Sequence, residues 1–180
     1  MAEPLSRTEE GWEHQFATNY LGHFGLSLGL HDALAQGAPA RIGALTSSGH
    51  FWSPVVLDDL QFDRRPYDPW LAYGQAKTAI VLFAVEATRR WAAEGITANA
   101  VMPGGIRTNL QQYQSGPEWE EIDRTYDWKT VEEGAAPALP ERSPKVAYGR
   151  AGGLVSQLTL WVSRKPQRKY RVAKVIAAEV

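Results

Sequence analysis

Two short apolar runs, one on each side of a long helical pattern, constrain the fold of this chain most strongly. Ile42–Leu45 leads into hydroxyl residues, and Ile96–Met102 stops at Pro103-Gly104-Gly105. Both runs are too short and too continuously apolar for amphipathic helices, so we predict two buried strands. The pattern between them, from Trp70 to about Ala93, predicts a helix. Alternating strands and helices indicate a parallel α/β sheet, in which ligands bind beyond the carboxyl ends of the strands.

A second helical pattern precedes the first strand. Ser6 and Glu9 have the spacing of a capping box, and Gly37 with Pro39 ends the pattern near residue 36. We therefore expect one helix over about residues 8–36, which is long for a globular domain. Three glycines inside it predict that another backbone approaches closely: Gly22, Gly25 and Gly29.

Tyr73 and Lys77 stand four residues apart at the start of the 70–93 helix. Residues at this spacing lie on one face of a helix, one turn apart. A free tyrosine has a pKa of about 10, and a nearby cation lowers that pKa because it favours the phenolate. The pair could therefore move a proton to or from a substrate oxygen. The same spacing also fits an ordinary helix with a solvated lysine.

Composition excludes several classes of protein. The chain has 180 residues, 44% hydrophobic and 22% charged, which is typical of one soluble domain. It contains no cysteine, so disulfides and thiolate chemistry are excluded. No apolar run approaches the roughly 18 residues of a membrane span, and the polar start lacks a signal-peptide core, so we expect a cytoplasmic protein. The four histidines lack ligand spacing, and we expect no metal site.

The end of the chain differs from the rest. Residues 141–180 hold nine basic residues and two acidic ones. We divide the chain into a folded part, 1–136, and an atypical, basic, poorly ordered tail, 137–180, in which 154–162 alternates like a strand. The basic run at 164–171 could bind a phosphate-rich partner, but a solvated tail is the simpler interpretation, and we expect no nucleic-acid partner.

Four motifs, in order and at matching intervals, resemble consecutive motifs of the short-chain dehydrogenases/reductases. They are Thr18-Asn19-Tyr20-Leu21-Gly22-His23-Phe24, Thr46-Ser47-Ser48-Gly49-His50, Tyr73-Gly74-Gln75-Ala76-Lys77 and Pro103-Gly104-Gly105-Ile106-Arg107-Thr108. The chain is most similar to the branch with retinol-dehydrogenase-like and WW-domain-oxidoreductase-like members. The resemblance covers about residues 4–136 and implies a Rossmann-type fold, a doubly wound parallel sheet.

The resemblance implies a role for each of four residues. Tyr73 would be the general acid in reduction or the base in oxidation, and Lys77 would lower its pKa and hold the nicotinamide ribose. Ser47 would hydrogen-bond the substrate oxygen, with Ser48 as the rival for that role. Asn19 would hold a water in a proton relay to Lys77.

The resemblance also implies NAD or NADP as cofactor. Besides Tyr73 and Lys77, the residues expected at the nicotinamide end lie after the second strand: Pro103, Gly104, Ile106 and Thr108. The Gly-rich turn that seats the pyrophosphate in this family has no counterpart in the sequence. We therefore expect a partial Rossmann-type fold lacking its N-terminal half, and an N-terminally truncated chain.

Two functions remain open at this point. The first is an oxidoreductase that transfers hydride between the cofactor and a small alcohol or carbonyl substrate. The second is a non-catalytic remnant that acts as a dimerisation module, with a homo-oligomer formed through the helices at about 8–36 and 70–93. The substrate is not specified by the sequence, although residues 107–128 carry aromatic side chains that predict a roomy lid for an apolar molecule: Tyr113, Trp119, Tyr126 and Trp128.

Overall fold

The computed structural model describes residues 1–135, so the predicted tail at 137–180 and its strand at 154–162 lie outside the described residues. The elements follow one another as α1 (His14–Phe16), the π-helical turn η1 (Ala17–Leu21), α2 (Gly22–Gly29), α3 (His31–Gln36), β1 (Ala40–Leu45), η2 (Ser48–Phe51), η3 (Leu57–Asp59), α4 (Pro69–Trp91), η4 (Ala92–Glu94), β2 (Ile96–Val101), η5 (Asn109–Gln111), α5 (Pro117–Thr125) and α6 (Val131–Ala135). Among these residues, no helix is both long and apolar enough to cross a bilayer.

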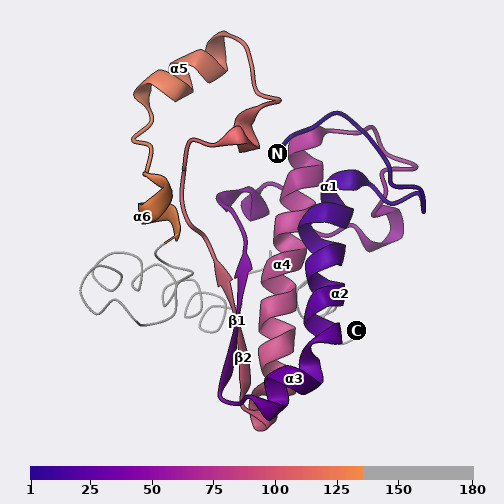
Figure 1. The fold of residues 1–180 in the computed structure, drawn as a ribbon. Coiled ribbons are helices and arrows are strands. Elements are labelled where there is room, and N and C mark those ends of the chain that lie inside the picture. The colour runs from indigo at the N-terminus through magenta and orange to yellow at the C-terminus, as the bar shows by residue number, and fades with distance from the viewer. Residues whose placement is uncertain (136–180) are drawn as a thin grey trace.

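The two predicted strands pair in parallel, which confirms the α/β architecture. β1 and β2 run side by side, with Ala40 opposite Ile96 and Leu45 opposite Val101 (Figure 1). Both strands therefore end at the same edge of the sheet. The turn into β2 requires Gly95, whose φ is +78° and whose absent Cβ would lie 2.8 Å from the Cβ of Ala38.

Helix α4 is the central element of the described fold. Asp68 begins it by accepting hydrogen bonds from the next two free backbone N–H groups, and Pro69 occupies the first turn. Its apolar face packs on the sheet and forms the main core cluster with Ala44 and Ala98. The buried residues that α4 contributes to this cluster are Ile80, Phe83, Ala84 and Ala87.

The prediction of a single helix over 8–36 is wrong. The helical segment begins at His14, where the buried carboxylate of Glu13, rather than Ser6, accepts the free N–H groups of Gln15 and Phe16. Leu30, with φ −95° and ψ 0°, separates α2 from α3. Tertiary contacts explain the late start, because the backbone N–H of Glu13 binds Gln61 and its side chain accepts from Tyr67.

The α1–η1–α2 segment lies beside α4 (Figure 1). A row of aromatic rings joins the two layers, running from Phe16 through Tyr20 and Phe24 to Phe83 of α4, with centroids 5.1–5.7 Å apart. The close backbone approach expected along α2 is absent at Gly25 and Gly29, where a Cβ would meet nothing within 4 Å.

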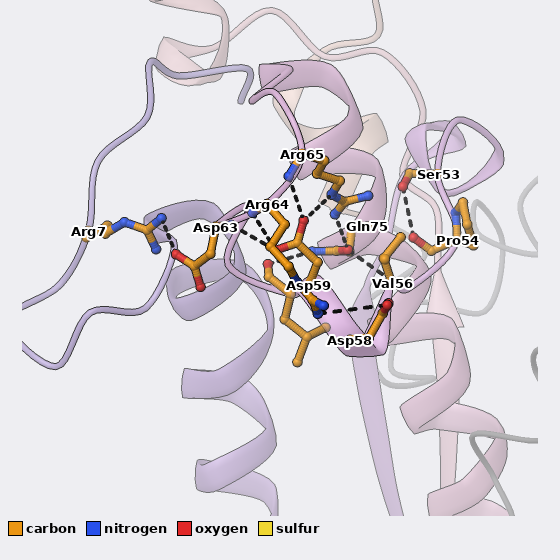
Figure 2. A network of polar contacts seen from close by, with 11 residues as sticks. Arg7, Ser53, Pro54, Val56, Asp58, Asp59, Asp63, Arg64, Arg65 and Gln75 are labelled. Carbon is orange, nitrogen blue, oxygen red and sulfur yellow. Dashed lines mark hydrogen bonds and ion pairs between the residues drawn. The ribbon is translucent and has the colours of Figure 1, made fainter.

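A polar network holds the segment between β1 and α4 against the helix (Figure 2). Burial would raise the pKa of Asp59, but backbone N–H groups of residues 63–65 and the charge of Arg65 outweigh burial and lower it. Arg65 in turn donates to Gln75 at 2.7 Å. Gln75 is fully buried and also accepts from the Val56 N–H and donates to the Leu60 carbonyl. These bonds fix the rotation of α4 around its axis.

Candidate active site

Ser47 and Tyr73 meet at the carboxyl end of the sheet. Ser47 comes two residues after β1 ends and caps η2, where its Oγ accepts the N–H of Gly49 at 3.2 Å. This bond uses a lone pair of the hydroxyl oxygen, so the hydroxyl proton remains available for another acceptor. The side chain of Ser47 lies close enough to the phenol of Tyr73 to lower the pKa of Tyr73. Ser48, the rival from the sequence, is exposed.

Two glycines make this approach possible. A Cβ on Gly74 would lie 2.7 Å from the carbonyl oxygen of Gly49, and a Cβ on Gly49 would lie 2.9 Å from Cε1 of Tyr73. Helix α4 therefore touches the η2 segment backbone to backbone, as only residues without a Cβ allow. The close approach expected from glycines in the first helical segment occurs here instead.

The environment of Tyr73 favours its protonated form. The side chain is 3% exposed, and burial raises the pKa of Tyr73 while the hydrogen bond from Ser47 partly opposes that rise. The ammonium of Lys77 lies 5.5 Å from the centroid of the Tyr73 ring. The pKa of Tyr73 is thus raised, whereas the charge of Lys77 alone would lower it.

Lys77 joins α4 to the end of β1. Its Nζ donates to the carbonyl of Leu45 at 3.0 Å, and the buried hydroxyl of Thr46 donates back to the carbonyl of Lys77 at 2.9 Å. Burial lowers the pKa of Lys77. Sequence reasoning missed the role of Thr46, although a hydroxyl residue at the end of a buried strand was a signal for it.

Asn19 lies in the π-helical turn of the neighbouring segment. This turn packs on α4 through Tyr20 and Leu21, next to Ala76 and Ala79. The Asn19 side chain is half-buried, and its backbone carbonyl accepts a hydrogen bond from Nδ1 of His23 at 3.2 Å. π-Turns inside helices are frequent at functional sites because they change which groups face the neighbour.

The turn after β2 lies at the same edge of the sheet as Ser47. Lys129 Nζ donates to the carbonyl of Pro103 at 2.9 Å and lies where a Cβ on Gly104, whose φ is +95°, would have to fit. The other two residues expected at the cofactor, Ile106 and Thr108, contact later parts of the chain. Ile106 packs on the backbone of α6, and Thr108 forms a capping box with Gln111 at the start of η5.

Aromatic side chains of the 107–128 segment fold back over this turn. The ring of Trp128 lies 4.8 Å from that of Tyr126 and 5.9 Å from that of Trp119, centroid to centroid. The ring of Tyr126 covers Gly105 so closely that a Cβ there would push the ring aside. We call these three rings the aromatic lid. Within the described part of the chain, no three His, Asp or Glu side chains are placed to hold a metal ion.

Comparisons with known proteins identify the family of this chain. Residues 62–119 match the family described as short chain dehydrogenase. A Streptomyces lividans protein named "Probable oxidoreductase" is 49% identical over 141 residues, covering 73% of this chain and 47% of that protein. Retinol dehydrogenase 13 of Homo sapiens is 45% identical over 110 residues, covering 61% of this chain and 33% of that protein.

A solved structure supports the same assignment. The crystal structure of an uncharacterized protein from Mycobacterium paratuberculosis matches with a TM-score of 0.51 at 38% identity, covering 62% of this chain and 41% of that one. The parallel strands and the helix between them define a partial Rossmann-type fold. A hydroxyl, a phenol and an ammonium lie at the carboxyl ends of the strands, where ligands of this fold bind. The chain belongs to the short-chain dehydrogenase/reductase family, as its motifs predicted. It spans less than half the length of these relatives.

Proposed function

We propose that this chain provides the proton-transfer site of an NAD(P)-dependent oxidoreductase that acts on an alcohol or carbonyl substrate. The observation that carries the proposal is the buried Tyr73, which lies beside Ser47 and Lys77 at the carboxyl end of two parallel strands. The family membership and the oxidoreductase relatives support the same class of reaction.

The side chains present fit the nicotinamide end of the proposed cofactor. An ammonium has three N–H donors, and the Leu45 carbonyl takes one of those on Lys77, so two are available for the hydroxyls of a ribose. Pro103 and Gly104 lie at the adjacent strand end, where ligands of such sheets bind, and Lys129 contacts both residues there. When bound, the nicotinamide accepts or supplies the hydride, and the protein positions and polarises the other reactant.

Tyr73 would exchange the proton that accompanies the hydride. Because burial raises the pKa of Tyr73, the phenol keeps its proton at neutral pH and can donate it to the oxygen of a carbonyl being reduced. Ser47 would hold the same oxygen and keep it in line with the phenol. In the reverse direction Tyr73 must first lose its proton, so alcohol oxidation should become faster as the pH rises while reduction falls off only at high pH.

The substrate that we propose is an apolar alcohol or its carbonyl form. Tyr126 of the aromatic lid covers Gly105 in the turn after β2, and Trp128 packs between Tyr126 and Trp119, so the lid would present ring surface to a ligand bound at that turn. Retinol dehydrogenase 13, one of the similar proteins, carries the name of an apolar alcohol. Aromatic walls of this kind bind apolar ligands through buried area rather than through many hydrogen bonds.

The test measures binding first and turnover second. Calorimetric titration of the purified 180-residue chain with NADH and NADPH should give saturable binding of one of them below millimolar concentration. With a hydrophobic aldehyde as substrate, Tyr73→Phe should lower turnover by about 100-fold or more, the usual contribution of a general acid. Tyr20→Phe, which keeps the ring that packs on Phe16 and Phe24, is the control and should act like the parent chain. No saturable binding of either nucleotide would refute the proposal for this chain.

A further inference from the structure

A histidine that has no part in the proposed proton transfer, His50, is hydrogen-bonded to the backbone of Ser47. Nδ1 of His50 lies 2.6 Å from the backbone carbonyl oxygen of Ser47. A carbonyl can only accept, so Nδ1 of His50 carries the proton of this bond. The bond fixes the peptide that follows Ser47 and with it the direction of the Ser47 side chain.

Thr78 connects this turn to the helix of Tyr73. Its hydroxyl lies 2.9 Å from the carbonyl oxygen of His50 and 2.7 Å from that of Ser53. The hydroxyl has one proton and donates it to one of these two carbonyls at a time, so a single side chain of α4 holds the C-terminal end of the η2 segment, a little more than one helical turn after Tyr73. Gly49 and Gly74 bring the backbones of the η2 segment and α4 into direct contact at the same place.

We propose that His50 is a positioning residue that acts through Ser47, with Thr78 as its anchor on α4. The proposal rests on the proposed function, because the geometry that His50 maintains is the one between the Ser47 hydroxyl and the Tyr73 phenol. His50 itself touches the backbone of Ser47 rather than the reacting atoms. Removing its ring takes away the shorter of two hydrogen bonds to the Ser47 carbonyl, since the backbone N–H of His50 donates to the same oxygen at 3.1 Å. The turn is then held less firmly, and the Ser47 hydroxyl can shift relative to Tyr73.

The test titrates Tyr73 directly and needs no turnover. The full chain is labelled with ζ-13C tyrosine, and the Tyr73 signal is assigned by its loss in Tyr73→Phe. Since the Ser47 hydrogen bond lowers the pKa of Tyr73, Ser47→Ala should shift the titration upward. His50→Ala should shift it in the same direction. His50→Asn, whose amide N–H can replace Nδ1–H, should titrate close to the parent chain.

Controls separate positioning from general stability. His31→Ala removes an imidazole that packs on Trp91 far from the site, and it should lower the melting temperature without moving the Tyr73 titration. If His50→Ala does not fold, Thr78→Val and Thr78→Ser replace it, with an upward shift expected for valine only. The proposal is overturned if the upward shift is missing in Ser47→Ala or in His50→Ala, or if asparagine fails to restore the parent value. A chain that binds no nucleotide still gives this result, so the two proposals fail separately.

Discussion

Replacing Gly74 by alanine tests whether the close contact between α4 and the η2 segment holds the site together. The new Cβ would lie 2.7 Å from the carbonyl oxygen of Gly49, 3.2 Å from the N of Ser53 and 3.3 Å from its Cβ. These neighbours are mostly backbone, so the clash cannot be relieved by turning a flexible side chain. Either α4 or the η2 segment must move.

Two opposing effects set the magnitude. Alanine in place of glycine inside a helix stabilises it by about 1 kcal/mol. Overpacking of a tight contact costs about 1–3 kcal/mol. The contact of Gly74 lies at the severe end because its nearest neighbour is a backbone oxygen, so we expect Gly74→Ala to lower the free energy of unfolding by about 1–2 kcal/mol net. Gly25 is the matched control, since it lies inside α2 with nothing within 4 Å, and Gly25→Ala should raise the same quantity by up to about 1 kcal/mol.

The assay is urea unfolding followed by tryptophan fluorescence and circular dichroism on both variants and the parent chain. The midpoints should move in opposite directions while the slope m stays constant, because neither change alters the surface exposed on unfolding. In a thermal scan the difference between the two variants should reach several degrees, at about 2–4 °C per kcal/mol. Gly74→Ala should also shift the Tyr73 titration upward, since it pushes Ser47 away. Equal stabilisation by both alanines would refute the close contact.

Two other substitutions test the polar groups of α4. Gln75→Leu should lower the free energy of unfolding by about 2–4 kcal/mol in urea, because it leaves the Val56 N–H and the Leu60 carbonyl without their partner. Hydrogen bonds from Arg89, then from Arg90, and their charges lower the pKa of Glu86 to about 2, so its contribution is complete above pH 4.5 and is lost as the pH falls toward 2. Solvent screens the two exposed arginines, so Glu86→Gln should cost only about 0.5–1 kcal/mol at pH 7, and the two unfolding curves should merge near pH 2.

Elements with strong local signals were predicted well. The two strands begin and end within about two residues of the apolar runs, and α4 begins where Asp68 and Pro69 supply a cap and a first turn. α5 begins at Pro117, and a proline suits the first turn of a helix because its missing N–H has no partner there. In each case neighbouring residues specify the boundary, so the tertiary structure has little to override.

The first helical segment shows where such signals fail. The Ser6–Glu9 pattern satisfies the spacing of a capping box, yet Ser6 instead offers its carbonyl to the N–H of His14. Glu13 takes the cap because Gln61 and Tyr67, about fifty residues away, fix it in place. A partner at that distance along the chain is invisible to a local pattern, and so is the π-helical turn that carries Asn19.

The tyrosine, lysine and serine of the site were found from sequence motifs, whereas the residues that bind backbone carbonyls near them, such as Thr78, were missed because no motif marks them. Beyond Leu45 the chain leaves β1, and the carbonyls of Leu45, Ser47, His50 and Ser53 no longer have strand partners. Buried carbonyls must find donors. Lys77 donates to the Leu45 carbonyl, the single hydroxyl proton of Thr78 serves the His50 or the Ser53 carbonyl, and both the ring and the backbone N–H of His50 donate to the Ser47 carbonyl.

The hydrogen bonds that stabilise the end of β1 therefore also orient the side chains proposed to react, those of Ser47, Tyr73 and Lys77. This overlap has a consequence for mutagenesis at Lys77. Lys77→Met removes a charge from the proposed cofactor site, but it also removes the exposed hydrogen bond to the Leu45 carbonyl, at a cost of about 0.5–1.5 kcal/mol. Loss of activity in that variant would have two causes. Lys77→Arg keeps a cation and a donor while changing the geometry presented to a ribose, so a variant that retains the parent stability and loses nucleotide binding would separate the structural role of Lys77 from its proposed catalytic one.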